Sequence, residues 1–246
     1  PLAVSILAAA NIVLPDINKK DIKKIVPRYG NQGIEKLKLS LKKSSDSINK
    51  SLKKYNKTAD NDFLYITKNN KISGSIFKLE NLKNFSTKYY RALKNINDNI
   101  TNVNEPGTSF VYSRFIGVGI HIFEEILNQN GYIDYFKQNE NPNLDNVRCY
   151  YCGVHKKNHS NIKHIFYPST YISLTGEKDE PDEIDFNKRS IISTIFNKDN
   201  NSTGQYIKVI LGSSVLTEGI SMFNIKDIHI LDAQYTLTKI DQIIGR

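Results

Sequence analysis

The chain has 246 residues, enough for one large domain or for one domain with an extension, and 39% of them are hydrophobic. This composition supplies a buried core and excludes a disordered chain. The formal net charge of +9 favours a polyanionic partner, although drift towards lysine and asparagine explains the same charge. No apolar run reaches the roughly 18 residues of a membrane span, so no membrane partner is expected.

Cysteine use and the two ends of the sequence bear on its setting. Cys149 and Cys152 form a single C-x-x-C, which cannot build a disulfide framework and favours a reducing, intracellular setting. The apolar opening residues 1–15 lack a basic region and an initiating Met, so we expect the interior of a longer protein rather than a signal peptide. Arg246 ends the sequence without a helix stop signal, which supports the same expectation.

Residues 1–104 are predicted to form a basic, mainly helical extension or linker region. Residues 33–55 carry leucines and isoleucines at helical spacing among lysines, and residues 79–93 repeat such a spacing. The pattern predicts amphipathic helices, the first with a basic outer face. Solvation explains such a face more often than nucleic-acid binding does, and the sequence leaves both interpretations open.

From residue 105 onwards, predicted strands alternate with predicted helices. Short runs rich in β-branched and aromatic residues predict strands at 108–113, 171–175, 207–212 and 228–232. Helical spacing predicts helices at 117–130, 186–196 and 236–246. This alternation predicts an α/β domain with a parallel sheet over residues 105–246.

The densest chemical signal lies in residues 209–246. A buried strand ends at Gly212 and is followed by Ser213, Thr217, Glu218 and Gly219. Ligands of open parallel sheets sit beyond the carboxyl ends of the strands, where glycine and hydroxyl residues allow close approach to a phosphate. Further along, Arg246 stands where an arginine on a helix could neutralise charge on a transferring phosphoryl group. Each piece alone means little, but their order and spacing are more specific.

In this order the residues resemble motifs V and VI of superfamily 2 helicases. Motif VI reads Q-x-x-G-R-x-x-R, and its second arginine would lie beyond the end of this sequence. The resemblance implies the second RecA-like domain of such a protein, truncated in motif VI. The matching residues are Gln242, Gly245 and Arg246 for motif VI, Gly212, Ser213 and 217–221 for motif V, 110–113 with Arg114 for motif IV, and Thr175-Gly176 for the segment after the next strand.

Residues 73–246 also resemble, more closely, helicases of large DNA viruses related to the poxvirus early transcription factor small subunit and its asfarvirus and mimivirus-type relatives. The resemblance implies that ATP with Mg²⁺ is held mainly by a first RecA-like domain, because no G-x-x-x-x-G-K-[ST] occurs here. It implies roles for three groups of residues. Arg246 and Gln242 would act in catalysis, and both would contact the nucleotide together with Glu218 and Gly219. The residues expected to contact a nucleic-acid backbone are Ser113, Arg114, Thr175, Gly176, Ser213 and Thr217.

The function implied is that of the C-terminal half of an ATP-dependent DNA or RNA helicase or translocase in viral transcription or replication. The expected partners are nucleic acid, the first RecA-like domain and a viral RNA polymerase or transcription complex. The expected location is the host cytoplasm, in viral factories, or the virion. Without a phosphate cradle, the fragment is not expected to be active alone. A non-catalytic binding scaffold and a remodeller-type translocase that does not unwind remain alternatives.

A second chemical cluster lies in a predicted insertion at residues 140–168. Cys149, Cys152, His159 and His164 give the spacing C-x2-C-x6-H-x4-H, which predicts a structural zinc knuckle because four protein ligands leave no open coordination position. His155 is a competing third ligand. The alternative is a polar insertion with incidental histidines and two reduced thiols. Neighbouring tyrosines and lysines also allow a weak prediction of nucleic-acid contact.

Overall fold

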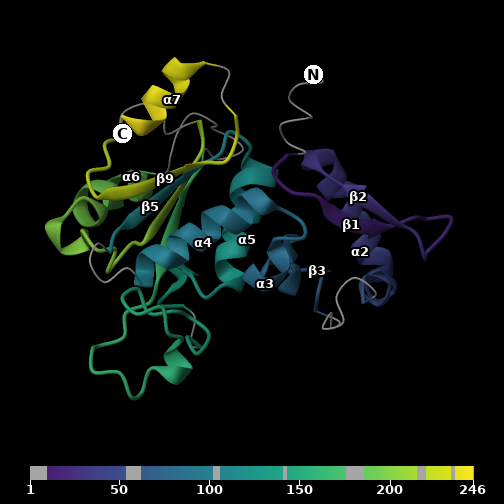
Figure 1. Ribbon diagram of the computed structural model, residues 1–246, viewed down its shortest axis with the longest axis horizontal. Helices are drawn as coiled ribbons and strands as arrows, with labels where there is room; N and C mark the ends of the chain where they lie inside the picture. The colour runs from purple at the N-terminus through teal and green to yellow at the C-terminus, as the bar shows by residue number, and fades with distance from the viewer. Residues whose placement is uncertain are drawn as a thin grey trace.

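The computed structural model describes residues 10–53, 62–101, 106–140, 143–175, 186–214, 220–233 and 236–245. Its centre is a five-stranded sheet in the order β6-β7-β8-β5-β9, in which every neighbouring pair is parallel (Figure 1). The predicted parallel α/β sheet is therefore confirmed, and it agrees with the RecA-like fold. The strands are β5 (Thr108–Tyr112), β6 (Ile133–Asp134), β7 (Thr170–Leu174), β8 (Val209–Gly212) and β9 (Ile225–Ile230).

The central strands are buried throughout and mostly apolar because helices cover both faces of the sheet. Every residue of β5 and β8 is buried. Side chains alternate between the faces, so Val111 joins one core cluster while its neighbours Phe110 and Tyr112 join the other. A sheet buried on both sides reads as a continuous apolar run, which is why these strands were predictable.

The two faces carry different helices. On one face lie α4 (Thr87–Thr101) and α5 (Ile122–Gln129), whose Leu93 and Phe123 belong to the same core cluster as Val111. The other face packs against α6 (Phe186–Ile191) and the π-helical turn Ile192–Phe196, and α7 (Leu237–Ile244) adds Ile243 to that cluster. The predicted helix 117–130 begins as a π-helical turn, Ile116–His121, before α5.

The N-terminal part contains the predicted helices. It also contains two β-hairpins that the sequence analysis did not predict. The predicted basic amphipathic helix is α2 (Gly30–Leu52), which buries Leu37, Leu41 and Ile48. Strands β1 (Leu14–Ile17) and β2 (Ile25–Arg28) form an antiparallel hairpin beside it. A second, shorter hairpin joins β3 (Tyr65–Ile66) to β4 (Ile72–Ser73).

The predicted helix over 79–93 is divided in two. A short helix α3 (Leu79–Leu82) precedes α4, and Ser86 lies between them. The Ser86 hydroxyl accepts a hydrogen bond from the Tyr89 N–H at 3.0 Å, which is the contact of an N-capping side chain. The capping serine therefore starts a new helix where spacing alone predicted a continuous one.

One hydrophobic cluster runs from Ile12 in the N-terminal part to Leu231 after β9. The Tyr89 hydroxyl crosses the predicted boundary at residue 104 and donates to the Val118 carbonyl at 2.7 Å. The division into an extension and a domain stays a prediction. Within the described residues, none of the helices combines the length and the apolarity that a membrane crossing requires.

Candidate functional site

Three of the predicted site residues meet at the carboxyl edge of the sheet. Ser113, Thr175 and Ser213 directly follow β5, β7 and β8. The Ser113 N–H donates to the Gly212 carbonyl at 3.0 Å, and the Ser213 N–H donates to the Leu174 carbonyl at 3.3 Å. These backbone contacts hold the ends of the three strands side by side, as expected at the carboxyl edge of a parallel sheet.

Asp232 is a residue of this edge that the sequence analysis did not single out. It follows β9, is 2% exposed, and accepts three hydrogen bonds from two other segments of the chain. The Ser113 hydroxyl donates to Asp232 Oδ2 at 2.7 Å, the Arg114 N–H donates to the same oxygen at 2.8 Å, and the Asn11 amide donates to Oδ1 at 2.5 Å. A buried carboxylate thus ties β9 to the turn after β5 and to the N-terminal part.

Positive charge lies near this carboxylate. Lys88 Nζ donates to the Asn11 side chain at 2.9 Å and to the Leu231 carbonyl at 2.6 Å. Partial burial lowers the pKa of Lys88, and the negative charge of Asp232 opposes that change. The same negative charge, after burial itself, raises the pKa of the fully buried Tyr89. The charge of Asp232 therefore acts on both Lys88 and Tyr89.

The predicted nucleic-acid residues differ in their burial and in the contacts of their side chains. Ser113 is buried and gives its hydroxyl to Asp232, so it holds the edge together rather than facing solvent. Ser213 is also buried, and its hydroxyl has no hydrogen-bond partner among the described residues. Arg114 is half-buried, with its guanidinium carbon 5.0 Å from the centre of the Phe115 ring. Thr175 is half-buried beside them.

Close packing at Ser113 depends on a glycine. Gly119 lies in the π-helical turn after β5, and a Cβ atom there would stand 1.9 Å from Ser113 Oγ. A side chain does not fit at that distance. The absence of one at Gly119 therefore allows the Ser113 hydroxyl to reach Asp232.

Much of the predicted nucleotide site lies outside the described residues, namely Glu218, Gly219 and Arg246. The predicted nucleic-acid residues Gly176 and Thr217 also lie outside them. Gln242 is described and lies exposed on α7, next to Ile243, which anchors the helix in the core. At the start of α7 the Thr236 hydroxyl accepts from the Lys239 N–H at 3.4 Å.

The four predicted metal ligands come together. The ligand atoms of Cys149, Cys152, His159 and His164 all lie within 4.8 Å of one another. His164 Nε2 lies 3.1 Å from His159 Nε2 and 3.4 Å from Cys149 Sγ. The competing ligand His155 is outside this group and instead pairs with Arg148 in a β-bridge. The cluster is compatible with zinc.

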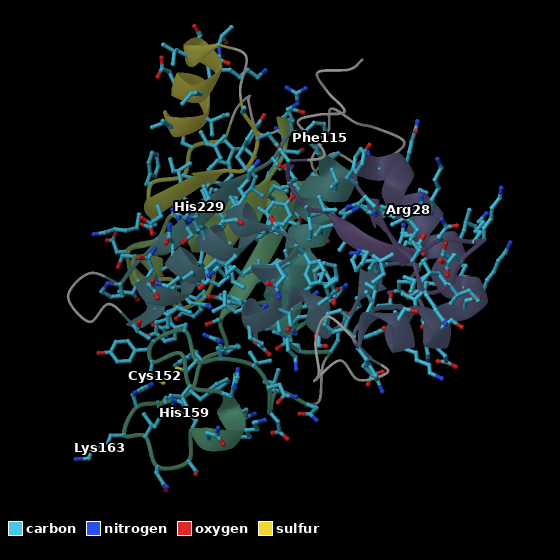
Figure 2. All side chains as sticks on the ribbon, turned by 45° about the vertical axis from the view of Figure 1, so that its right-hand side comes forward. Arg28, Phe115, Cys152, His159, Lys163 and His229 are labelled. Carbon is cyan, nitrogen blue, oxygen red and sulfur yellow. The ribbon has the colours of Figure 1, made fainter. Side chains whose placement is uncertain are left out.

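The Cys/His cluster lies far from the carboxyl edge. The segment that carries the cluster leads directly into β7. Ser169, the residue before β7, donates its N–H to the Arg148 carbonyl. Parallel strands all begin at one edge and end at the other, so the insertion belongs to the amino edge. Figure 2 shows Cys152, His159 and Lys163 at one end of the molecule and Phe115 near the other.

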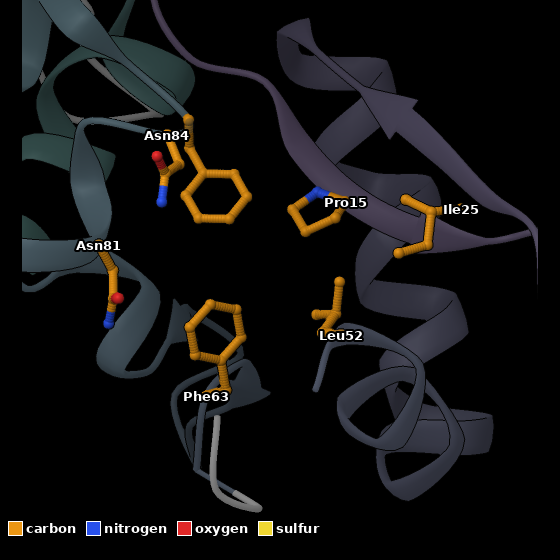
Figure 3. A pocket seen from close by; sticks show the side chains of 7 residues that line it. Pro15, Ile25, Leu52, Phe63, Asn81 and Asn84 are labelled. Atoms are coloured by element: carbon orange, nitrogen blue, oxygen red, sulfur yellow. The ribbon is translucent and has the colours of Figure 1, made fainter. Parts of the chain in front are cut away.

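A cavity of about 460 Å³ lies among the N-terminal elements. Figure 3 shows Pro15, Leu52 and Phe63 around it. Residues 54–61, which follow α2 in the chain, are outside the described part, so we assign no ligand to this cavity. Its lining residues are Pro15, Ile25, Leu52, Phe63, Asn81, Asn84 and Phe85.

Comparison with known proteins gives relatives in large DNA viruses. "Putative ATP-dependent RNA helicase L377" of Acanthamoeba polyphaga mimivirus is 38% identical over 97% of the chain. "Early transcription factor large subunit homolog" of African swine fever virus is 25% identical over 71% of it, and "Putative helicase 087L" of Invertebrate iridescent virus 3 is 29% identical over 68%. No protein-family model and no solved structure matches the chain.

The matches cover only a segment of each relative. The chain spans 22%, 16% and 14% of the lengths of the mimivirus, African swine fever virus and iridescent virus proteins. The African swine fever virus relative is named for the large subunit of the transcription factor, whereas the resemblance seen in the sequence was to kin of the small subunit. The chain is therefore similar to one segment of helicase-named and transcription-factor-named proteins of large DNA viruses, and its parallel α/β sheet is consistent with a helicase-like protein of superfamily 2.

Proposed function

We propose that this chain is the second RecA-like domain of an ATP-dependent nucleic-acid helicase or translocase of a large DNA virus. The observation that carries the proposal is the meeting of Ser113, Thr175 and Ser213 at the carboxyl edge of a parallel sheet. Ligands of such sheets bind at this edge. The helicase names of two relatives support the same class of activity.

In this proposal the carboxyl edge grips one nucleic-acid strand by its phosphates. Arg114 supplies charge, and Thr175, Gly176 and Thr217 supply hydroxyl and backbone groups. Ser213 is buried and packs beneath this surface. Ser113 contributes by fixing the turn that carries Arg114, because its hydroxyl and the Arg114 N–H share one Asp232 oxygen. Contacts of this kind are independent of base sequence and weaken with salt.

The nucleotide part of the proposal concerns the interface with a first RecA-like domain. That domain would hold ATP with Mg²⁺, and closure would bring Gln242, Glu218, Gly219 and Arg246 against the nucleotide. Gln242 is exposed on α7, as a residue at a domain interface must be before closure. Cycles of closure and opening would then move the strand through relative domain motion. We expect no turnover from the chain alone.

The setting that we propose is viral transcription or replication, with a viral RNA polymerase or transcription complex as partner, in host-cell viral factories or the virion. The transcription-factor name of the African swine fever virus relative favours transcription. A non-catalytic scaffold would lack a phosphate-binding loop and an acidic metal-binding motif upstream in the full protein. A remodeller-type translocase would hydrolyse ATP without displacing a strand.

The test is the salt dependence of binding to single-stranded DNA and RNA of one sequence by the full-length protein that carries this chain. Arg114→Ala should lower the slope of log affinity against log salt by about 1, because one phosphate contact is lost. Lys163→Ala removes the same charge at the opposite edge and should leave the slope unchanged. Equal slopes for both variants and the parent would refute the grip.

A further inference from the structure

We infer that Cys149, Cys152, His159 and His164 bind one Zn²⁺ ion, and that this ion is the main source of order in the insertion 143–168. The inference goes beyond the proposed motor function, because the cluster lies at the amino edge of the sheet, away from the nucleotide and strand contacts. All four ligand atoms lie within 4.8 Å of one another. Two thiolates and two imidazoles form one of the common donor sets of structural zinc.

Two of the distances between ligand atoms are close to those around a tetrahedral ion. Zn–N bonds of about 2.0–2.1 Å and Zn–S bonds of about 2.3 Å place two nitrogens about 3.4 Å apart and a nitrogen and a sulfur about 3.6 Å apart. His159 Nε2 and His164 Nε2 are 3.1 Å apart, and His164 Nε2 is 3.4 Å from Cys149 Sγ. The widest ligand pair, at 4.8 Å, needs to close by about 1 Å.

Hydrogen bonding accounts poorly for the same contacts. The single nitrogen His164 Nε2 faces both His159 Nε2 and Cys149 Sγ at contact distance. One ring nitrogen either donates one hydrogen or accepts one, so it can satisfy only one of these neighbours well. A cation between the four groups satisfies all of them at once, and it leaves no position open for a substrate.

The backbone shapes the cysteine pair for this role. The Gly153 N–H donates to the Cys149 carbonyl at 3.0 Å, and the Cys149 N–H donates to the Val154 carbonyl at 2.9 Å. Gly153 has a φ of +70°, which most other residues adopt only with strain. This tight turn brings the two thiols to one side, and Cys149 is also held in a β-bridge to Pro168.

The insertion buries few apolar side chains of its own. Among its described residues, only Val147 and Cys149 are buried apolar side chains, while Ile165 is 75% exposed. Two buried side chains cannot offset the conformational entropy of ordering a segment of this length. Small segments of this kind depend on a metal or on disulfides, and both cysteines here are free thiols.

The experiment measures zinc in the full-length protein that carries this chain, purified in reducing buffer without chelators. Zinc is quantified by elemental mass spectrometry in the parent protein and in Cys152→Ser, His164→Gln and His155→Gln. We expect both ligand variants to hold one equivalent of zinc less than the parent. His155→Gln removes a histidine from the same loop but not from the cluster, so it should keep the full zinc content.

Hydrogen exchange then tests the structural role. Removing the ion from the parent with a chelator should speed amide exchange across 143–168 and leave β5 and β8 protected. Equal zinc content in the parent and both ligand variants would overturn the inference, and so would a Cys149–Cys152 disulfide in the purified protein or unchanged exchange after the ion is removed. These readouts do not involve nucleic acid, so a failure here leaves the proposed function standing, and the reverse also holds.

Discussion

The Ser113 hydroxyl donates to Asp232 Oδ2 at 2.7 Å, and this contact joins the ends of two strands that are 119 residues apart in sequence. The same oxygen accepts from the Arg114 N–H. A carboxylate that is 2% exposed is stable only when its oxygens are satisfied. The carboxyl edge therefore has a preformed shape that depends on Asp232.

Replacing Asp232 with Asn should lower the free energy of unfolding by about 2–3 kcal/mol. An amide has one oxygen and one NH₂ group, so its NH₂ would face either the Asn11 amide or the Ser113 and Arg114 donors. The measurement is urea denaturation of the chain followed by circular dichroism. The control is Asp98→Asn, which removes an exposed ion pair with Lys94 and should change the free energy of unfolding far less, because solvent screens such pairs. Equal losses from the two variants would contradict this role for Asp232.

Gly119→Ala should destabilise the chain by about 1–3 kcal/mol, because its Cβ would stand 1.9 Å from Ser113 Oγ. The new methyl group must push the Ser113 side chain away from Asp232. In a double-mutant cycle, Ser113→Ala should relieve part of the strain, so that the double variant loses less stability than the sum of the single variants. Strict additivity would show that the two residues do not interact in this way.

Lys208 gives a pH dependence. It precedes β8, is fully buried, and donates to the Thr203 carbonyl at 2.9 Å. Burial lowers its pKa from 10.5 to about 8. Between these values the unfolded chain binds the proton and the folded chain does not, so the free energy of unfolding rises with pH across this window.

Below about pH 8 both states are protonated and the burial penalty is fully present. Lys208→Met should therefore raise the free energy of unfolding by about 3 kcal/mol below that pH. The gain should vanish above about pH 10.5, where the lysine is neutral in both states. Denaturant titrations of the two proteins across this range measure the difference. A gain that stays constant with pH would point to packing rather than to the buried charge.

The sequence predicted the sheet well and the N-terminal hairpins not at all. The strands β5, β7 and β8 consist mostly of apolar, β-branched and aromatic residues, so the local sequence is enough to predict them. In β1 and β2 a proline stands within each short strand, which argues against a strand by pattern. Pro15 and Pro27 lie opposite each other in the hairpin, an arrangement that only the fold reveals.

The candidate site likewise has residues that the sequence analysis predicted and one that it did not. The spacing of cysteines and histidines predicted four residues that the fold brings together, and His155 lies outside that group. Asp232 had no local signal, because a single Asp after a strand is common. Its role follows from contacts with Asn11 and Ser113, both far away in sequence. The motif residues around Gly219 and Arg246 stay predictions, since they lie outside the described residues.

The most direct test of the account is the nucleic-acid-stimulated ATPase rate of the full-length protein that carries this chain. If the chain completes the nucleotide site of a first RecA-like domain, Arg246→Ala should lower the turnover number by about 1,000-fold or more. Lys163→Ala, at the amino edge, should leave it within about 2-fold, because surface charges far from the site act weakly. An Arg246→Ala protein that hydrolyses ATP at the parent rate would contradict the central claim.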